Sequence, residues 1–352
     1  MSFANNLIAW YQLKKRDLPW RKTKDPYFIW LSEIIMQQTR VAQGLPYYER
    51  FVELFGNIQL LAEAPEQEVL KAWQGLGYYS RARNLHFTAK NIYEEHQGVF
   101  PNNYKDLLKL KGVGVYTAAA IASISYQEPV AVVDGNVYRV LARYFGVYDA
   151  PDSTIGKKAF AKLAQEVMNI DYPDIYNQAI MEFGALQCKP GLPDCSICIF
   201  NDNCIAFLTN SVISLPTKTK KTKVRNRFFI YLVIKTKKGV YMNKRTANDV
   251  WKNMYDFPLI EVDSFDHNLL ALASASPILS TFDLPAITEV SLEYKHILSH
   301  QHIYAKFASV TVLKKPSQEV DKLVFITFEE LKKIPVPKLI ENFFDIELFR
   351  YI

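Results

Sequence analysis

The sequence predicts two domains, an all-helical domain followed by a smaller α+β domain. The chain has 352 residues, more than one typical domain needs, and 49% of them are apolar, enough to build two cores. Before about residue 212, apolar side chains recur every three or four positions, as on the buried face of a helix. From residue 228 onward, β-branched and aromatic runs between turn sequences indicate strands.

Segments within each part can be assigned individually. Helical spacing, interrupted by clusters of Pro, Gly and Asn, covers residues 6–13, 27–45, 66–76, 116–126 and 155–168. Strand-like composition covers residues 227–235, 239–245 and 302–313. We expect two closing helices, at residues 325–334 and 337–349.

The net charge of +6 is concentrated in one short segment. Residues 1–215 carry 21 basic and 21 acidic side chains, and residues 228–352 carry 15 of each. Residues 216–227 carry six basic side chains and no acidic one. We interpret this segment as the linker between two domains with these boundaries. Its charge either contacts a polyanion or is simply solvated.

The sequence shows no secretory or membrane segment. Its first residues lack a basic start followed by an apolar run, and no stretch approaches the roughly 18 apolar residues of a membrane helix. We therefore expect a soluble, intracellular protein of the cytoplasm, without a membrane partner.

All four cysteines lie within residues 188–204, with the spacing C-x6-C-x2-C-x5-C. They are Cys188, Cys195, Cys198 and Cys204. Because disulfides are rare in a reducing compartment, a metal site is the better interpretation. Four thiolates suit structural zinc, and they also suit a 4Fe-4S cluster. The chemistry of the thiols alone leaves these two alternatives open.

A hairpin of two helices is predicted at residues 107–124, with a turn that contains Gly112 and Gly114. Glycines allow a sharp turn and expose backbone N–H groups. At a helix N-terminus such groups attract phosphate without reading base sequence. An ordinary connection between packed helices is the alternative interpretation.

Two carboxylates have surroundings that suit acid–base chemistry. Glu33 lies among apolar residues, so burial should raise its pKa and keep it protonated near neutral pH. Asp134 lies where an apolar run gives way to a helix, so it should cap that helix and stay ionised. A proton donor and an anion are the pair that cleavage of a glycosidic bond needs. Alternatively, Glu33 is a partly exposed helix residue and Asp134 is only a cap.

Four segments around these residues resemble one enzyme family. WLSEIIMQQTRV, WQGLGYYSRARNL, LKGVGVYTAAA and VVDGNVYRVLAR are similar, in order and spacing, to the adenine DNA glycosylases of the MutY type. These enzymes belong to the helix-hairpin-helix DNA glycosylase superfamily, and the cysteine spacing resembles that of their iron–sulfur loop. The resemblance covers essentially the whole chain and is strongest over residues 18–204. It implies an all-α helix-hairpin-helix domain with a 4Fe-4S cluster, followed by an α+β Nudix-like domain.

The resemblance also implies a reaction, the hydrolytic removal of adenine opposite 8-oxoguanine or guanine in duplex DNA. Glu33 would protonate adenine, Asp134 would stabilise the cationic sugar, and Tyr116 and Asn136 would support the intermediate. Bifunctional relatives have a lysine at the position of Tyr116, so we expect a monofunctional enzyme. A glycosylase for another base, a non-catalytic DNA-binding module and a nucleotide hydrolase are the competing interpretations.

Several positions match the DNA contacts of the family. Gln37, Gln38 and Thr39 follow Glu33 on the same predicted helix, and they would hold the duplex open after the base is flipped out. Tyr78 would insert beside the damaged base.

Other matches concern the base and the phosphate backbone. Trp20 and Arg21 match the adenine pocket of the family. Lys111 replaces the proline that usually precedes the position of Gly112, and it would add a phosphate contact.

The C-terminal domain lacks the glutamate-rich box of Nudix hydrolases, so we expect it to recognise the lesion without hydrolysis. In the segment HILSHQH, Ser299 and His300 match the family loop that detects 8-oxoguanine, and Leu298 replaces its phenylalanine. We expect the protein to act on DNA as a monomer, in association with the nucleoid.

Overall fold

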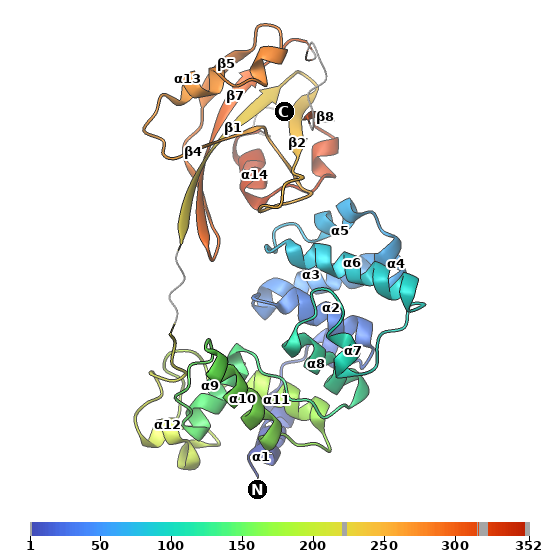
Figure 1. The fold of residues 1–352 in the computed structure, drawn as a ribbon, viewed down its shortest axis with the longest axis vertical. Helices are drawn as coiled ribbons and strands as arrows, with labels where there is room; N and C mark the ends of the chain where they lie inside the picture. The colour runs from blue at the N-terminus through green and yellow to red at the C-terminus, as the bar shows by residue number, and fades with distance from the viewer. Residues whose placement is uncertain (1, 220–223, 315, 317–322, 349–352) are drawn as a thin grey trace. The chain divides into compact units, whose positions relative to one another are not determined.

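The chain is described by a computed structural model, which covers residues 2–219, 224–314, 316 and 323–348. It divides into two compact units, whose ribbons are drawn in Figure 1. The helical unit comprises residues 1–63 and 84–220, and the mixed unit comprises residues 64–83 and 221–352. Among the described residues, no helix combines the length and the apolar character that a membrane crossing requires.

Ten helices lie wholly in the described part of the helical unit. They are α1 (Phe3–Lys14), α2 (Pro26–Met36), α3 (Val41–Leu54), α4 (Ile58–Glu63), α7 (Tyr104–Leu107), α8 (Val115–Tyr126), α9 (Gly135–Phe145), α10 (Thr154–Val167), α11 (Pro173–Leu186) and α12 (Ile205–Leu208). Short 3-10 helices at Pro19–Arg21 and Asn201–Asn203 complete the set, and α6 (Ser80–Glu95) crosses the boundary between the units.

The core of the helical unit forms around α8 and α11. Helix α8 contacts α2, α7 and α11, while α11 also contacts α1 and α9. Residues 117–124 of α8 are all buried, and most of them are small, so neighbouring helices can approach closely. This packing brings α2, α8, α9 and α11 together, and these helices carry the candidate site.

The single helix expected at residues 27–45 is two helices, so that expectation is wrong. Helix α2 ends at Met36, and α3 begins at Val41. Between them Gln38 has a φ of 55°, which lies outside the helical range, and the Thr39 N–H donates to the Met36 carbonyl across a tight turn. Gln37, Gln38 and Thr39 therefore form a turn after α2 rather than a continuation of the helix that carries Glu33.

The mixed unit is built on one sheet of eight strands. They are β1 (Arg225–Lys235), β2 (Gly239–Lys244), β3 (Tyr255–Asp256), β4 (Leu259–Val262), β5 (Ala286–Val290), β6 (Tyr294–Ile297), β7 (Gln301–Thr311) and β8 (Leu323–Thr327). The order along the sheet is β3-β2-β1-β7-β5, and β4, β6 and β8 pair with β1, β7 and β2. Strands β1 and β7 are parallel, whereas the other pairs are antiparallel. The strands expected at residues 227–235, 239–245 and 302–313 are confirmed as β1, β2 and most of β7.

The closing helices are partly as expected. Residues 325–334 are not one helix, because they hold the end of β8 and a 3-10 turn at Glu330–Lys332. Pairing of β8 with β2 explains this difference, since a neighbouring strand decides over local preference. The last expected helix begins with α14 (Lys338–Phe343) and continues to Leu348, and residue 349 lies outside the described residues. The Phe343 ring stacks on Phe307 of β7 at a centroid distance of 4.0 Å.

A helix from the first part of the sequence packs in the mixed unit. Helix α5 (Glu66–Ala72) lies in residues 64–83, which group with the C-terminal residues. The Gln74 amide donates to a Glu341 carboxylate oxygen at 2.7 Å, and the Lys71 ammonium donates to the Ile334 carbonyl at 3.1 Å. The expected boundaries at residues 215 and 228 stay a prediction.

The basic segment at residues 216–227 contains residues 220–223, which lie outside the described residues. On its N-terminal side, the hydroxyls of Thr217 and Thr219 donate to the Tyr148 carbonyl and the Asp152 carboxylate. On its C-terminal side, the Arg227 side chain is only 9% exposed, because it is paired with carboxylates of β4 and of the loop after β2. Arg227 is therefore structural, and its charge is not free for a polyanion.

Candidate active site and cysteine loop

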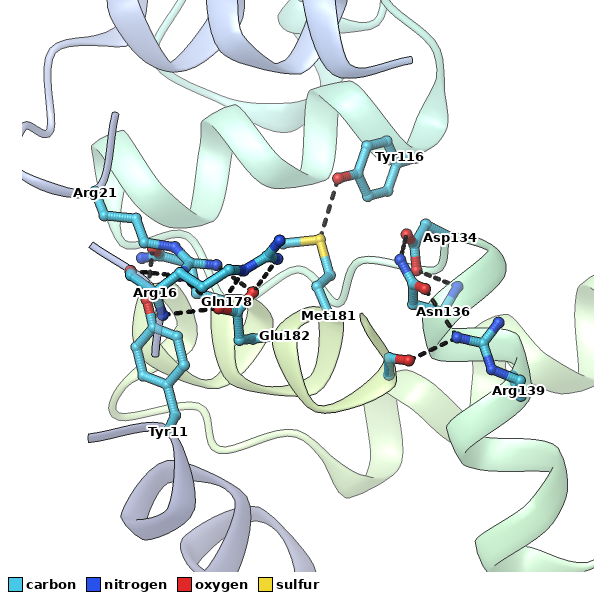
Figure 2. Close-up of polar contacts among 11 residues, drawn as sticks. Tyr11, Arg16, Arg21, Tyr116, Asp134, Asn136, Arg139, Gln178, Met181 and Glu182 are labelled. Atoms are coloured by element: carbon cyan, nitrogen blue, oxygen red, sulfur yellow. Dashed lines mark hydrogen bonds and ion pairs between the residues drawn. The ribbon is translucent and has the colours of Figure 1, made fainter. Parts of the chain in front are cut away.

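A cavity of about 490 Å³ in the helical unit brings most of the expected catalytic and pocket residues together. The residues lining it that the sequence singled out are Trp20, Arg21, Glu33, Thr39, Tyr116, Asp134 and Asn136. They come from the first 3-10 helix, from α2 and the turn after it, and from the N-terminal ends of α8 and α9. Figure 2 shows Asp134 next to Asn136, with the Tyr116 hydroxyl directed at Met181 of α11.

Glu33 is a half-buried residue whose side chain lines the cavity. It projects from the otherwise apolar helix α2, whose other residues Trp30, Leu31, Ile34 and Ile35 are core. Burial raises the pKa of Glu33 to about 7, a hydrogen bond with Tyr116 opposes the rise, and the charge of Asp134 adds to it. Glu33 can therefore hold a proton near neutral pH.

Asp134 caps helix α9 with one oxygen and holds Asn136 with the other. Its Oδ1 accepts from the backbone N–H groups of Asn136 and Val137, both at 2.8 Å, and its Oδ2 accepts from the Asn136 side-chain amide at 2.8 Å. Burial raises the pKa of Asp134, and these hydrogen bonds to its ionised form oppose the rise. The cap expected from the sequence is thus present, and the carboxyl group also faces the cavity.

Tyr116 lies on the first turn of α8 beside both carboxyl groups. Burial and the neighbouring Glu33 and Asp134 raise the pKa of Tyr116 well above its ordinary value, so the phenol stays neutral. Its hydroxyl donates to the Met181 sulfur at 3.1 Å, as Figure 2 shows. A neutral phenol can donate a hydrogen bond in this cavity, and it cannot act as an amine nucleophile.

Glu182 of α11 is a cavity residue that the sequence reasoning missed. Its carboxylate accepts two hydrogen bonds from the Arg21 guanidinium, at 2.9 and 2.7 Å, and two from that of Arg16, at 2.9 and 2.5 Å (Figure 2). Burial alone would raise the pKa of Glu182, but the hydrogen bonds from both arginines outweigh it and lower the pKa to about 2. A charged residue inside the apolar run IMEFGAL was the signal that could have identified it.

Arg139 of α9 is a second residue that the sequence reasoning missed. Its guanidinium donates to the Asn136 side-chain oxygen at 2.9 Å, to the Gly184 carbonyl at 2.7 Å and to the Cys188 carbonyl at 2.7 Å. It therefore connects Asn136 with the start of the cysteine loop. In the sequence Arg139 simply follows Asp134 by five positions, and this spacing did not indicate the connection.

The hairpin residues are not among those lining this cavity. Gly112 has a φ of 82°, and a β-carbon there would lie 2.8 Å from that of Asn84, so the turn requires glycine. Gly114 is the N-cap of α8. The Lys111 ammonium lies 4.2 Å from the centroid of the Phe87 ring, a cation–π contact on an exposed surface.

The four cysteines line one small cavity of about 30 Å³ between α9, α11 and α12, and none forms a disulfide. Burial and the neighbouring thiols raise the pKa of Cys198 to about 11. The buried Arg143 donates to the Cys188 sulfur at 3.5 Å and to two carbonyls of the loop. Ionised thiols in such a place need cationic partners. The four cysteines therefore fit a metal group that all four thiolates bind. Within the described residues, no three His, Cys, Asp or Glu side chains form a single-ion site.

A second group of expected residues lines a cavity of about 310 Å³ within the mixed unit. Tyr78, with a φ of 48°, lines it together with Leu298 and His300. Leu298, Ser299 and His300 form the turn between β6 and β7, and Ser299 and His300 are exposed. The structure thus brings Tyr78 beside the expected lesion loop, although more than 200 residues separate them in the sequence.

Comparisons with known proteins agree with this description. The model of the HhH-GPD superfamily base excision DNA repair proteins matches residues 31–166, and a NUDIX domain model matches residues 230–345. The adenine DNA glycosylase of Buchnera aphidicola subsp. Schizaphis graminum is 33% identical over 347 residues, covering 98% of this chain and 95% of that protein. The adenine DNA glycosylase of Homo sapiens is 41% identical over 214 residues, 58% of this chain and 39% of that one.

Solved structures extend the comparison to the fold. A thermostable thymine-DNA glycosylase matches with a TM-score of 0.55 and 29% identity, covering 59% of this chain and 95% of that one. A non-covalent endonuclease III–DNA complex matches with a TM-score of 0.51, at 20% identity, over 59% of this chain and 94% of that one, and it supports the fold alone.

The helical unit and its match define a DNA glycosylase of the HhH-GPD superfamily, a base excision repair enzyme that hydrolyses N-glycosidic bonds. It is joined to a Nudix-like α+β domain. The relatives that match over nearly the whole chain then decide the particular family: this chain belongs to the adenine DNA glycosylases.

Proposed function

We propose that this enzyme removes adenine opposite 8-oxoguanine or guanine in duplex DNA, by hydrolysis and without cutting the strand. The observation that carries the proposal is the pair of carboxyl groups in one cavity, Glu33 with a pKa of about 7 and the helix cap Asp134. The names of the full-length relatives support the choice of adenine.

The two carboxyl groups divide the chemistry between them. The Glu33 carboxylic acid protonates adenine at N7, which turns the base into a better leaving group, and the resulting carboxylate then activates water. The Asp134 carboxylate, held by its hydrogen bonds with α9, stabilises the positive charge that develops on the sugar. Asn136 and the neutral phenol of Tyr116 stabilise the intermediate by hydrogen bonding.

The absence of an amine nucleophile supports monofunctional chemistry. Tyr116 occupies the position where a lysine would form a covalent adduct, and no lysine is among the described residues that line the cavity. Water is then the group that attacks the sugar.

DNA recognition requires flipping adenine out of the helix into this cavity. Trp20 and Arg21 form part of the adenine pocket, with Arg21 oriented by its ion pair with Glu182. In the turn after α2, Gln37, Gln38 and Thr39 act as the wedge. That turn is suited to the role, because Gln38 is exposed at its tip.

Contacts outside the cavity complete the recognition of DNA. The hairpin turn of Lys111, Gly112 and Gly114 binds the backbone through N–H groups and one lysine. The cavity lined by Tyr78, Leu298 and His300, with Ser299 in the adjoining turn, accepts 8-oxoguanine or guanine. We propose that a monomer carries out all these contacts on nucleoid DNA.

Cys188, Cys195, Cys198 and Cys204 would hold a 4Fe-4S cluster. When bound, the cluster supplies a cross-link between the two ends of the loop. The chain's own Arg143 and Arg139 then tie that loop to α9, whose first turn carries Asn136. Lys189, beside the first cysteine, would contact phosphate.

The test is incubation of the purified protein with duplexes that contain A·8-oxoguanine, A·G, T·G or thymine glycol, with and without alkali. We expect abasic sites from the first two duplexes, and strand breaks only after alkali. Borohydride should trap little covalent adduct. Excision of thymine instead of adenine, or breaks without alkali, would contradict the proposal.

A further inference from the structure

The cavity of the mixed unit has a wall that the expected lesion residues do not supply. This wall is the second half of the loop between β2 and β3, residues 249–254, of which Asp249, Val250 and Trp251 line the cavity. At about 310 Å³, the cavity is at the lower end of the range for small-ligand pockets, and its size suits one base. This second part of the lining therefore bears on which base is accepted.

The backbone of this loop has a positive φ at two positions, and it is strained at Trp251. Trp251 has a φ of 62° and Asn253 a φ of 67°, in the left-handed region that bulky side chains avoid. Such strain persists only where the surroundings hold it in place, and it concentrates at functional sites. Because this conformation costs free energy for a tryptophan, it indicates that the tryptophan ring itself is needed at this position.

Contacts from both sides hold the loop in this conformation. From the sheet, the Arg245 guanidinium donates to the Val250 carbonyl at 3.0 Å, and the Arg227 guanidinium donates twice to the Asp249 carboxylate, at 2.9 Å. The Asn253 backbone N–H donates to the Arg245 carbonyl at 2.7 Å.

From the segment at residues 64–83, two further contacts fix the same loop. The Arg83 guanidinium donates to the Lys252 carbonyl at 3.0 Å, and the Asn253 side chain donates to a Glu66 carboxylate oxygen at 2.6 Å. The position of Trp251 is thus determined by side chains from three different parts of the mixed unit.

The ring of Trp251 meets the strand that leads into the lesion loop. Trp251 is 5% exposed and packs edge-on against His296 of β6, at a centroid distance of 5.6 Å and an interplanar angle of 65°. His296 and Leu298 are two residues apart, and both line the cavity. Leu298 has no ring with which to stack, and His296 of β6 is the residue through which Trp251 contacts this part of the cavity.

We propose that Trp251 is a positioning residue for the base opposite adenine, which holds His296, and through β6 the turn of Leu298, Ser299 and His300, against the cavity. Through this contact it sets the preference for 8-oxoguanine over guanine. This inference deepens the proposed function and rests on it.

The experiment compares variants of the full-length, cluster-loaded protein. Trp251→Gly removes the ring and relieves the strained backbone, whereas Trp251→Phe keeps an edge-on ring. The matched control is Leu284→Gly, because Leu284 also has a positive φ, of 47°, and lies in the same unit, but it is 90% exposed and is not among the residues that line the cavity.

The readout is discrimination, the ratio of single-turnover excision rates from A·8-oxoguanine and A·G duplexes. We expect Trp251→Gly to lower this ratio about twofold to tenfold, the range that loss of an aromatic pair gives. Trp251→Phe should restore most of it, and Leu284→Gly should leave it unchanged. Affinities for duplexes with an uncleavable adenine analogue opposite 8-oxoguanine or guanine should shift in parallel.

Each other outcome counts against the inference. An unchanged ratio in Trp251→Gly, or an equal loss in Leu284→Gly, overturns it while leaving the proposed function intact. If circular dichroism shows that Trp251→Gly does not fold, His296→Ala decides by the same ratio. Failure of the parental protein to release adenine from either duplex overturns the proposed function, and this inference falls with it.

Discussion

At the scale of single residues, the environment of Glu33 explains why an ordinary carboxylic acid can keep its proton near neutral pH. Its neighbours on α2 are core residues, so the ionised form loses hydration without gaining a cation. Glu182 of α11 has the opposite environment, because hydrogen bonds from two arginines keep its carboxylate ionised. The two glutamates differ in pKa because of their partners, not because of their residue type.

Glu33 gives a prediction for the pH dependence of activity. Because its pKa is raised to about 7, the acid form is present below that pH and is lost above it. We expect the single-turnover excision rate to fall above about pH 7, and Glu33→Gln to lower it by about 10²- to 10⁴-fold. A rate that stays level up to about pH 9, far above the pKa of Glu33, would argue against Glu33 as the acid.

The same substitution, Glu33→Gln, should lower activity but raise the stability of the folded protein. A carboxyl group whose pKa rises from 4.5 to about 7 on folding destabilises the folded protein progressively as pH rises through this interval. Glu33→Gln should therefore raise the melting temperature at about pH 8, and much less at about pH 4. Differential scanning calorimetry at both pH values measures this, and a lower melting temperature at the higher pH would show that the burial argument is wrong.

At the scale of secondary-structure elements, α9 serves two purposes through its first turn. Its cap, Asp134, stabilises the helix and faces the cavity, and its Arg139 reaches the cysteine loop. The N-terminal part of α9 thus links the cavity with the cysteine loop.

The two purposes of Asp134 can be separated by substitution. Serine can still cap a helix but carries no charge, whereas alanine does neither. We expect Asp134→Ser to keep the melting temperature near that of the parent while excision falls about 10²-fold or more. Asp134→Ala should also lose about 1 kcal/mol of stability. If Asp134→Ser retained full activity, the charge would have no catalytic role.

The contact between α9 and α11 gives a further prediction. A β-carbon on Gly184 would lie 2.6 Å from that of Asn136 and 2.9 Å from its carbonyl oxygen, whereas one on Gly135 meets nothing within 4 Å. We expect Gly184→Ala to destabilise the protein by about 1–3 kcal/mol, and Gly135→Ala to leave its stability nearly unchanged. Chemical denaturation of the two variants measures the difference, and equal midpoints would contradict the packing described here.

At the scale of the whole molecule, the chain does not divide at one point along the sequence. Residues 64–83 pack in the mixed unit, with contacts such as Gln74 to Glu341, while the residues on either side belong to the helical unit. Tyr78 therefore shares a cavity with Leu298 and His300, and both parts of the sequence are needed to build it.

The cysteine loop gives a prediction for the intact protein. We expect the purified protein to be brown and to contain iron and acid-labile sulfide in equal amounts, without stoichiometric zinc. Cys195→Ala should lose iron and lower the melting temperature, and Ser196→Ala, an exposed neighbour in the same loop, should do neither. Metal analysis and visible spectroscopy distinguish the two metals, and a full complement of zinc without iron would exclude the cluster.

Patterns along the chain were sufficient for much of the fold and the site. Helical spacing, strand composition and an Asp before a helix depend on neighbours in the sequence, and α8, α10, β1, β7 and the cap at Asp134 appear as expected. The local rules failed at residues 325–327, where pairing with the distant β2 makes a strand. They also failed at Gln38, whose positive φ forms a turn that ends α2.

The sequence by itself predicted the two-part architecture and the grouping of the cysteines in one loop, because each is encoded in residue types and spacings, and it singled out Glu33 and Asp134 as candidates. Only the tertiary structure decided which charges are free and which are paired. It placed Arg16 and Arg21 on Glu182, Arg227 on Asp249, and Trp251 beside His296. The physical reason is that a charge or a ring acquires its pKa and its orientation from groups within a few ångströms, and those groups come from parts of the chain that only folding brings together.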